Sequence, residues 1–443
     1  MIKINSELRP EDLCSKIKRL WEVSAPKIWS LDRDDVPGAV TPVFTVQGKY
    51  TARGWTEWTQ GFVYGSALLQ FDATGEEEFL RLGRDRTVQR MAHHLTHFGV
   101  HDHGFNNVST YGNLWRLMRE GRIAENARET EFYELALKCS GAVQAARWTH
   151  IANGEGFIHS FNGPHSLFAD TIRSLRALAL SHQLGHLLMG ERDERISLLR
   201  RLVEHLRTTA KWTVFYGTGR DVFDVRGRVA HESVFNVNDG SYRCPGTQQG
   251  FSPFTTWTRG LAWIMCGYAE QLEWIATQPD QELERIGGRD AIEAVMLNAA
   301  KATCDFYIEE TPTDGVPYWD TGAPGLVRLG DYRERPAEPF NEYEPVDSSA
   351  AAIAAQGLLR LAHFLADREQ EASQRYWRAG LTVADTLFAE PYLSMEENHQ
   401  GLLLHSIYHR PNGWDHIPSD RKIPCGEASM WGDYHLRELA LYV

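Results

Sequence analysis

The sequence predicts an all-α protein, an (α/α)6 barrel whose six helical hairpins form a single domain spanning residues 1–443. Apolar residues recur at three- and four-residue steps through long segments, whereas strand-like alternation is scarce. Six segments open with a polar or aromatic cluster, continue into a helix rich in small and apolar residues, and are followed by a more charged helix. No linker that would divide the chain into separate domains is visible.

The six openings lie at 58–62, 107–112, 170–175, 257–260, 347–350 and 431–434. The fifth is the clearest, because Asp347 and the two serines after it supply N-cap chemistry and the run 350–361 is a strong helix former. That helix is apolar on nearly all sides, which predicts burial, and the helix 369–387 after it is amphipathic and charged. Six such pairs predict an inner and an outer ring, with the inner N-terminal ends gathered at one mouth.

Two long segments, 216–256 and 310–346, carry many turn-forming residues and few helix signals. Loops of this length inside a compact domain are usually functional. We therefore expect both of them to contribute to a site.

Charge, apolar stretches and aromatic content indicate which classes of partner the protein can have. The chain has 46 Lys and Arg against 59 Asp and Glu, a formal net charge of −13, which disfavours a nucleic-acid-binding surface. The sequence contains no stretch of about 20 apolar residues that is free of charged residues, so no membrane span is predicted. The 14 Trp, 16 Tyr and 19 Phe residues are typical of carbohydrate sites, although most aromatic rings should fill the helical core.

The six cysteines are scattered, and no two of them form a CxxC pair. This spacing indicates neither a zinc site nor a disulfide framework, and it favours free buried thiols in a reducing compartment. The first residues show no apolar segment typical of a signal peptide, so the predicted location is cytoplasmic.

A first candidate site is the segment 97–105, in which three histidines surround Asp102. The alternating spacing suits a tight turn better than a metal-binding helix face, so no metal is predicted. Asp102 is then either a carboxylate at the barrel mouth or a turn residue that bonds its own backbone.

A second candidate is Asp170, at the start of an inner helix. It is either an N-cap residue or a proton donor. A helix N-terminus lowers the pKa of an acid, whereas burial and a nearby like charge raise it. Our hypothesis is that Asp102 supplies that like charge, so that the two aspartates titrate as a coupled pair and Asp170 is protonated in the free protein.

The third and richest candidate combines His231, Gln249, Trp257 and Arg259. An amide, a flat ring and a guanidinium in close sequence suit a uronic sugar, which offers hydroxyls, a ring face and a carboxylate. Trp263, on the same predicted helix, is either a further ring contact or a core residue.

These motifs together resemble the unsaturated glucuronyl hydrolases of glycoside hydrolase family 88, over most of the chain from Trp58 to 431–434. The most specific parts are Gln249-Gly250 with the run 257–263, the run 347–354, and the segment 316–320 before it. The resemblance implies an (α/α)6 barrel, no cofactor, and an oligosaccharide substrate that carries a 4,5-unsaturated uronic acid at its non-reducing end.

The implied reaction is hydration of a vinyl ether, in which an Asp protonates C4, water adds at C5 and the resulting hemiketal opens. The acid/base Asp of the family matches Asp170 and its second active-site Asp matches Asp102. The matching sugar-binding residues are His231, Gln249, Trp257 and Arg259, with Trp58 and Trp263 as expected ring contacts.

The chain departs from the family pattern after Asp170, where Arg173 introduces a cation near the expected site, and the segment between Asp102 and Asp170 looks longer than usual. These departures leave two alternatives open. One is an exo-β-glucuronidase that acts on saturated glucuronides, and the other is a non-catalytic carbohydrate-binding barrel. A polysaccharide lyase is disfavoured, because no Tyr/His pair stands out in a lyase-like motif.

Overall fold

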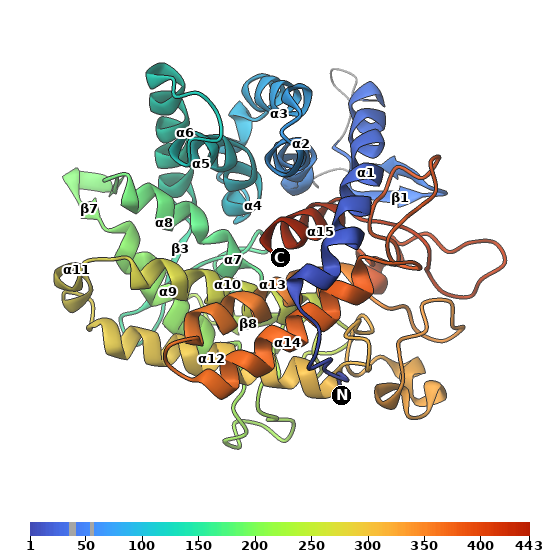
Figure 1. Ribbon diagram of the computed structural model, residues 1–443. Helices are drawn as coiled ribbons and strands as arrows, with labels where there is room; N and C mark the ends of the chain where they lie inside the picture. Colours follow the sequence, from blue (N-terminus) through green and yellow to red (C-terminus); the bar gives the residue numbers. More distant parts are fainter. Residues whose placement is uncertain (35–40, 54–56) are drawn as a thin grey trace.

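The computed structural model describes residues 1–34, 41–53 and 57–443, and it shows the predicted barrel (Figure 1). Each of the six predicted openings lies in or beside an inner helical segment of this described part. In chain order the inner segments are α2 (Gln60–Thr74), α4 with η3 and α5 (His103–Asn107, Val108–Gly112 and Asn113–Arg119), α7 with α8 (Thr171–Ser174 and Arg176–Gln183), α10 (Thr258–Ala276), α13 (Ser348–Leu365) and α15 (Met430–Tyr442). Successive inner segments contact one another, and α15 contacts α2, so the inner ring closes.

The outer helices pack against the inner ring. They are α3 (Glu77–Arg90), α6 (Ala127–Ala146), α9 (Leu198–Trp212), α12 (Arg289–Glu310), α14 (Gln370–Leu387) and α1 (Pro10–Asp34), with the short α11 (Asp280–Glu284) before α12. The first helix of the chain, α1, packs against α2 and α15, the last inner helix (Figure 1). The two ends of the chain therefore complete one hairpin together.

Helix α13 shows why the sequence forms an inner helix. The Asp347 carboxylate accepts hydrogen bonds from the backbone N–H groups of Ser349 and Ala350, as an N-cap should. Its side chains are buried along almost the whole length, as predicted. The glycine at 357 permits a close approach to α10, because a Cβ atom there would lie 2.8 Å from the backbone nitrogen of Cys266.

The strands are short and lie in the connections between helices. They are β1 (Phe44–Val46), β2 (Lys49–Thr51), β3 (Trp148–His150), β4 (Gly156–Ile158), β5 (Ser166–Phe168), β6 (Leu188–Met189), β7 (Arg195–Ile196), β8 (Glu232–Phe235) and β9 (Tyr242–Gly246). Strands β5, β8 and β9 form one antiparallel sheet. The backbone N–H of Ala169 donates to the carbonyl of His231 at 2.9 Å, so the sheet fixes the position of the chain directly before α7.

The two long loops predicted from composition meet at the start of α10. Strands β8 and β9 lie in the first loop, whereas the second contains the 3-10 turns η5 (Pro324–Leu329) and η6 (Tyr332–Glu334). Trp257, directly after the first loop, forms an isolated β-bridge with Asp320 of the second. The Asp320 carboxylate also accepts a hydrogen bond from the backbone N–H of Phe251 at 2.9 Å.

All six cysteines are free, but the prediction that they are buried holds only in part. Cys14 and Cys244 are exposed and Cys139 is half-buried, because α1, α6 and β9 turn these positions outward. Among the described residues, no helix is both long and apolar enough to cross a bilayer.

Candidate active site

A cavity of about 430 Å³ opens where the inner helices begin. It is lined by seven of the eight residues proposed from the sequence, namely Trp58, Asp102, Asp170, Gln249, Trp257, Arg259 and Trp263. These residues come from four different inner segments and their connections, so the barrel brings together positions that are far apart in the chain. The eighth residue, His231, does not line the cavity.

Asp102 reaches the cavity because α4 and α7 pack unusually close together. A Cβ atom at position 104 would lie 2.2 Å from the carbonyl oxygen of Ser174, so only glycine permits this approach. The contact sets Asp102, just before α4, beside Asp170, just before α7. The Asp102 side chain is buried and makes no capping bond to α4, which argues against the turn-residue alternative.

Asp170 occupies the N-cap position of α7, but its side chain makes no capping hydrogen bond. Its Oδ2 atom instead accepts a hydrogen bond from Nε2 of His101 at 3.1 Å. Its Oδ1 atom is buried without a hydrogen-bond partner in the described part of the chain. An unsatisfied buried carboxylate oxygen is costly, and its position at the cavity indicates a functional role rather than a capping role.

His101 connects the two aspartates, and sequence reasoning missed it. Its Nε2 atom lies 3.1 Å from Oδ2 of Asp170 and 3.7 Å from Oδ1 of Asp102. The ring is buried, and it stacks on Phe161 with 6.0 Å between ring centroids. The segment 97–105 did contain a signal, because a histidine beside an aspartate is common in acid–base sites, but no sequence pattern shows which carboxylate it contacts.

The three groups influence one another's charge, and the directions of their pKa shifts oppose our hypothesis that Asp170 holds the proton. Burial raises the pKa of Asp102, and the Asp170 charge adds to this against the opposing charge of His101. Burial also acts to raise the pKa of Asp170, but the charge and hydrogen bond of His101 outweigh it, so that pKa is lowered. Burial acts to lower the pKa of His101, yet the two carboxylates prevail and raise it. These directions favour an ionised Asp170 beside a protonated His101 in the free protein.

Arg259 organises one wall of the cavity. Its Nη1 atom donates to Asp347 at 2.6 Å, and both side chains are buried. Its Nη2 atom donates to the carbonyl of Tyr408 at 2.7 Å and to Oε1 of Gln249 at 3.2 Å. These bonds orient the Gln249 amide. Because the charge of Arg259 is already paired with Asp347, Arg259 would position a ligand through its fixed orientation and not as an unpaired cation.

Trp257 covers the Arg259 guanidinium, whose central carbon lies 4.6 Å from the ring centroid. His231 supports this wall from behind. Its ring centroid lies 4.8 Å from that of Trp257, and its Nδ1 atom accepts a hydrogen bond from the backbone N–H of Gln248 at 2.9 Å. Burial lowers the pKa of His231 to about 3, so the ring is neutral and can act as this acceptor.

Trp58 and Trp263 form further aromatic walls. Trp58 stacks on Trp431 with 5.1 Å between ring centroids. Trp263 packs 4.9 Å from Phe105 and is 2% exposed, so it is both a core residue and a boundary of the cavity. The remaining lining residues that the sequence analysis did not propose include Glu57, His97, Phe105, Phe161, Tyr408 and His409.

Arg173 does not lie in the cavity, which corrects the expectation of a cation near the expected site. It is fully buried in an ion-pair cluster with Glu270 and Glu438. The prediction that no metal is bound stays a prediction. His101, Asp102 and Asp170 offer ligand atoms within 4.8 Å of one another, a set whose chemistry also suits a divalent cation.

The chain is similar to hydrolases of unsaturated uronides. It is 28% identical over 406 residues to an unsaturated glucuronyl hydrolase of Bacillus sp. strain GL1, which corresponds to 89% of this chain and 88% of that relative. It is 22% identical over 421 residues to an unsaturated chondroitin disaccharide hydrolase of Streptococcus pyogenes serotype M1, 92% of this chain and 86% of that relative. No family model matches the chain.

The fold is shared with solved structures. The unsaturated glucuronyl hydrolase from Bacillus sp. GL1 superposes with a TM-score of 0.70 at 23% identity, covering 96% of this chain and 95% of that chain. One from Streptococcus agalactiae has a TM-score of 0.70 at 19% identity, covering 100% and 96% of the two chains. These likenesses support the barrel assignment.

The location of the proton can be tested by NMR titration of the histidines. We expect His101 to titrate above its ordinary pKa of 6.5, because two buried carboxylates favour its charged form. The substitution Asp102→Asn removes one of these charges, so the His101 midpoint should move to lower pH. Burial lowers the pKa of His94 to about 3, so His94 serves as an internal control whose midpoint should not change in Asp102→Asn. A His101 midpoint that stays in place in Asp102→Asn would contradict the coupling.

Proposed function

Since this chain belongs to the family of unsaturated glucuronyl hydrolases, we propose that it is a glycoside hydrolase that releases a 4,5-unsaturated uronic acid from the non-reducing end of lyase-generated oligosaccharides. The observation that carries the proposal is the buried pair Asp102 and Asp170, joined by His101 in an aromatic cavity. We infer that residues 1–443 act as one catalytic domain. The cytoplasmic location expected from the first residues of the sequence stays a prediction.

In the proposed reaction, Asp170 delivers a proton to C4 of the unsaturated ring and positive charge develops at C5 and the ring oxygen. A water molecule attacks C5 and gives a proton back to Asp170, which is thereby restored. The hemiketal opens by breaking the bond between C5 and the ring oxygen, and the hemiacetal at C1 then expels the second sugar as an alcohol. One carboxyl group thus serves first as the acid and then as the base.

The proton held by His101 is the one that this step requires. A protonated His101 beside an ionised Asp170 and a neutral His101 beside a protonated Asp170 contain the same number of protons. The bound uronate brings a further negative charge and displaces water, and both effects favour the arrangement in which the carboxyl group is neutral. Shifting the proton across the 3.1 Å hydrogen bond then prepares Asp170 as the acid.

The walls of the cavity suit a single sugar ring. Trp58, Trp257 and Trp263 offer flat apolar surfaces to the ring, and the oriented amide of Gln249 offers a hydrogen bond to its polar edge. The cavity is also large enough, at about 430 Å³, for one ring and the beginning of a second.

The runner-up function is an exo-β-glucuronidase on saturated substrates. An inverting glycosidase needs carboxyl groups separated by roughly 6.5–9.5 Å to admit a water molecule between them and the sugar. Carboxylate oxygens of Asp102 and Asp170 lie within 4.8 Å of each other, which disfavours an inverting mechanism. A retaining glycosidase, whose carboxyl groups are roughly 5–5.5 Å apart, is compatible with this separation, so the choice between the two functions rests on the substrate that is turned over. In a non-catalytic barrel the unpartnered oxygen of Asp170 would only accept a hydrogen bond from a sugar hydroxyl, so turnover of the bound sugar distinguishes that alternative from the hydrolase.

The function is tested by incubating the protein with an unsaturated uronic disaccharide and following the ultraviolet absorbance of the C=C bond. We expect this absorbance to disappear as the reducing sugar is released. Release of glucuronate from a saturated β-glucuronide without loss of the unsaturated substrate would support the runner-up. Binding of either sugar without turnover would support the non-catalytic barrel.

Replacing the proposed proton donor should abolish turnover while preserving the shape of the site. For Asp170→Asn we expect kcat to fall by roughly 10²–10⁴-fold or more, the range for general acid–base groups, with sugar binding retained. Asp385→Asn is a matched control, because Asp385 pairs with Lys16 on the outer surface of α14. An Asp170→Asn protein within about threefold of the parent would exclude this role.

Trp257 should affect sugar binding more than folding. We expect Trp257→Phe to raise KM, because the smaller ring covers less of the sugar face, while kcat changes little. Trp212→Phe is the control, since Trp212 stacks on Tyr242 outside the cavity with 4.4 Å between ring centroids. A lowered melting temperature with unchanged KM for Trp257→Phe would show that Trp257 is a core residue only.

We expect turnover to need no metal, because vinyl-ether hydration requires only a proton and water. Protein dialysed against EDTA should therefore keep its activity on the unsaturated disaccharide. Activity that is lost on dialysis and restored by a divalent cation would make His101, Asp102 and Asp170 metal ligands.

A further inference from the structure

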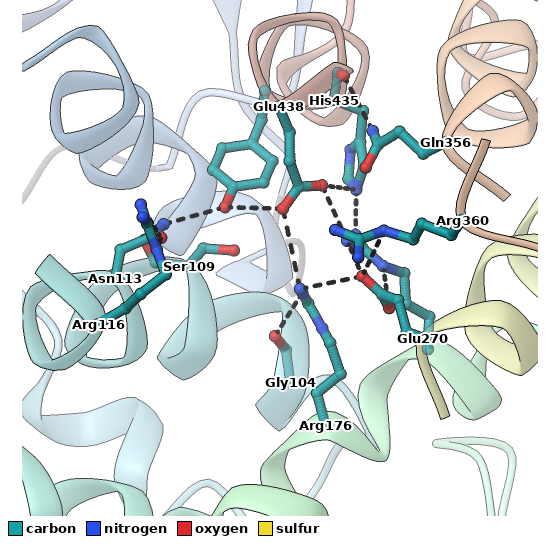
Figure 2. A network of polar contacts seen from close by, with 12 residues as sticks. Gly104, Ser109, Asn113, Arg116, Arg176, Glu270, Gln356, Arg360, His435 and Glu438 are labelled. Carbon is teal, nitrogen blue, oxygen red and sulfur yellow. Dashed lines mark hydrogen bonds and ion pairs between the residues drawn. The ribbon is translucent and has the colours of Figure 1, made fainter. Parts of the chain in front are cut away.

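A buried network of charges crosses the barrel axis below the cavity. Figure 2 shows Glu270 and Glu438 at its centre, with Arg176, Arg360 and His435 around them. Arg173 completes it. Its Nε and Nη2 atoms donate to the two oxygens of Glu270 at 2.9 and 2.8 Å, and Nη2 also donates to Glu438 at 2.8 Å. The network therefore ties α7, α10 and α15 together inside the ring.

Some members of the network line a second cavity, and others are enclosed by protein on all sides. A second cavity, of about 440 Å³, is lined by Arg176, Glu270, Arg360 and Glu438. Arg173 and His435 line neither this cavity nor the first one, so they lie within the packed layer between the two. Both of these side chains are fully buried.

His435 connects the network to the wall of the first cavity. Its Nδ1 atom donates to the carbonyl oxygen of Trp431 at 2.6 Å, which leaves Nε2 as an acceptor for Nη1 of Arg173. Burial, with the charge of Arg173, lowers the pKa of His435 to about 3, so this neutral form persists. The two hydrogen bonds fix the orientation of the imidazole ring.

The fixed imidazole ring packs directly against Trp263. The two rings meet edge to face, with 5.0 Å between centroids. The Arg173 guanidinium carbon also lies 5.9 Å from the Trp263 ring. Trp263 lines the first cavity, so a change in the network reaches the sugar-binding surface through one ring.

We propose that Arg173 is a positioning residue, which holds His435 and thereby sets the Trp263 wall of the sugar site. The inference rests on the proposed function, since it assigns a role in binding the sugar ring. The guanidinium of Arg173 bonds Glu270, Glu438 and His435 from three separate nitrogens of one rigid plane. An ammonium group has three N–H donors on a single nitrogen, so it cannot hold the same three partners in these positions. The cation that departs from the family pattern thus acts from below the site and not within it.

The test compares Arg173→Lys with Arg360→Lys. Both variants keep a positive charge in the network, but Arg360 pairs with Glu273 at 2.7 Å and borders the second cavity. We expect Arg173→Lys to raise KM for the unsaturated disaccharide by about threefold to tenfold, the size of one aromatic contact, with a much smaller change in kcat. Arg360→Lys should leave KM unchanged.

A second variant and a second measurement separate this inference from the function itself. His435→Phe keeps a ring beside Trp263 but removes the acceptor, and it should raise KM as Arg173→Lys does, with no further increase in the double variant. In protein labelled with 5-fluorotryptophan, the Trp263 fluorine resonance, assigned with Trp263→Phe, should shift in Arg173→Lys and stay in place in Arg360→Lys.

An inactive parent would refute the proposed hydrolase, whereas the fluorine signal would still decide whether Arg173 positions Trp263. A folded Arg173→Lys protein with the parental KM and an unmoved Trp263 resonance would overturn the inference. Equal effects of Arg173→Lys and Arg360→Lys would do so too, because they would show a purely structural network.

Discussion

The candidate active site depends on one close contact, between the backbone at Gly104 and the carbonyl of Ser174. This contact lets α4 and α7 touch, and so it places two aspartates from distant parts of the chain on either side of His101. It is reinforced by the Ser174 hydroxyl, which accepts a hydrogen bond from the backbone N–H of Gly104. Any larger side chain at position 104 would separate the two inner segments, and the shared proton would then lose one of its partners.

Two buried ion networks hold the rest of the site, one beside Trp257 and the other beside Trp263. Near the mouth, Arg259 and Asp347 fix the Gln249 amide and the carbonyl of Tyr408. Below it, Arg173 joins α7 to α10 and α15. Buried ion pairs contribute little net stability, because desolvation offsets most of their attraction. Their value here is geometric, since planar guanidinium groups with several fixed partners define the positions of the helices that carry the site.

The sequence predicted the ring of helices and most of the site for a clear physical reason. Inner helices repeat a local pattern of cap and apolar run, and the residues at their starts must meet at one mouth whatever the details of packing. It could not show that His101 bonds Asp170, that Arg173 points away from the cavity, or that His231 stands behind Trp257. These facts depend on side-chain directions across helices distant in sequence, and such directions are set only by tertiary packing. The hypothesis that free Asp170 holds the proton left out His101 for the same reason, because no sequence pattern showed that this histidine contacts Asp170.

The location of the proton explains how a site with closely spaced carboxylates can work on an unsaturated sugar. A glycosidase acting on a saturated bond needs a distinct acid and a distinct base or nucleophile, each at its own distance from the sugar. Hydration of a double bond needs one group that gives a proton and takes one back, together with a reservoir that keeps this proton available. In the proposed reaction His101 is that reservoir, since its raised pKa favours keeping the proton in the buried site, while the contact with His101 lowers the pKa of Asp170. In the same proposal, the substrate supplies through its own carboxylate the negative charge that moves the proton from His101 to Asp170.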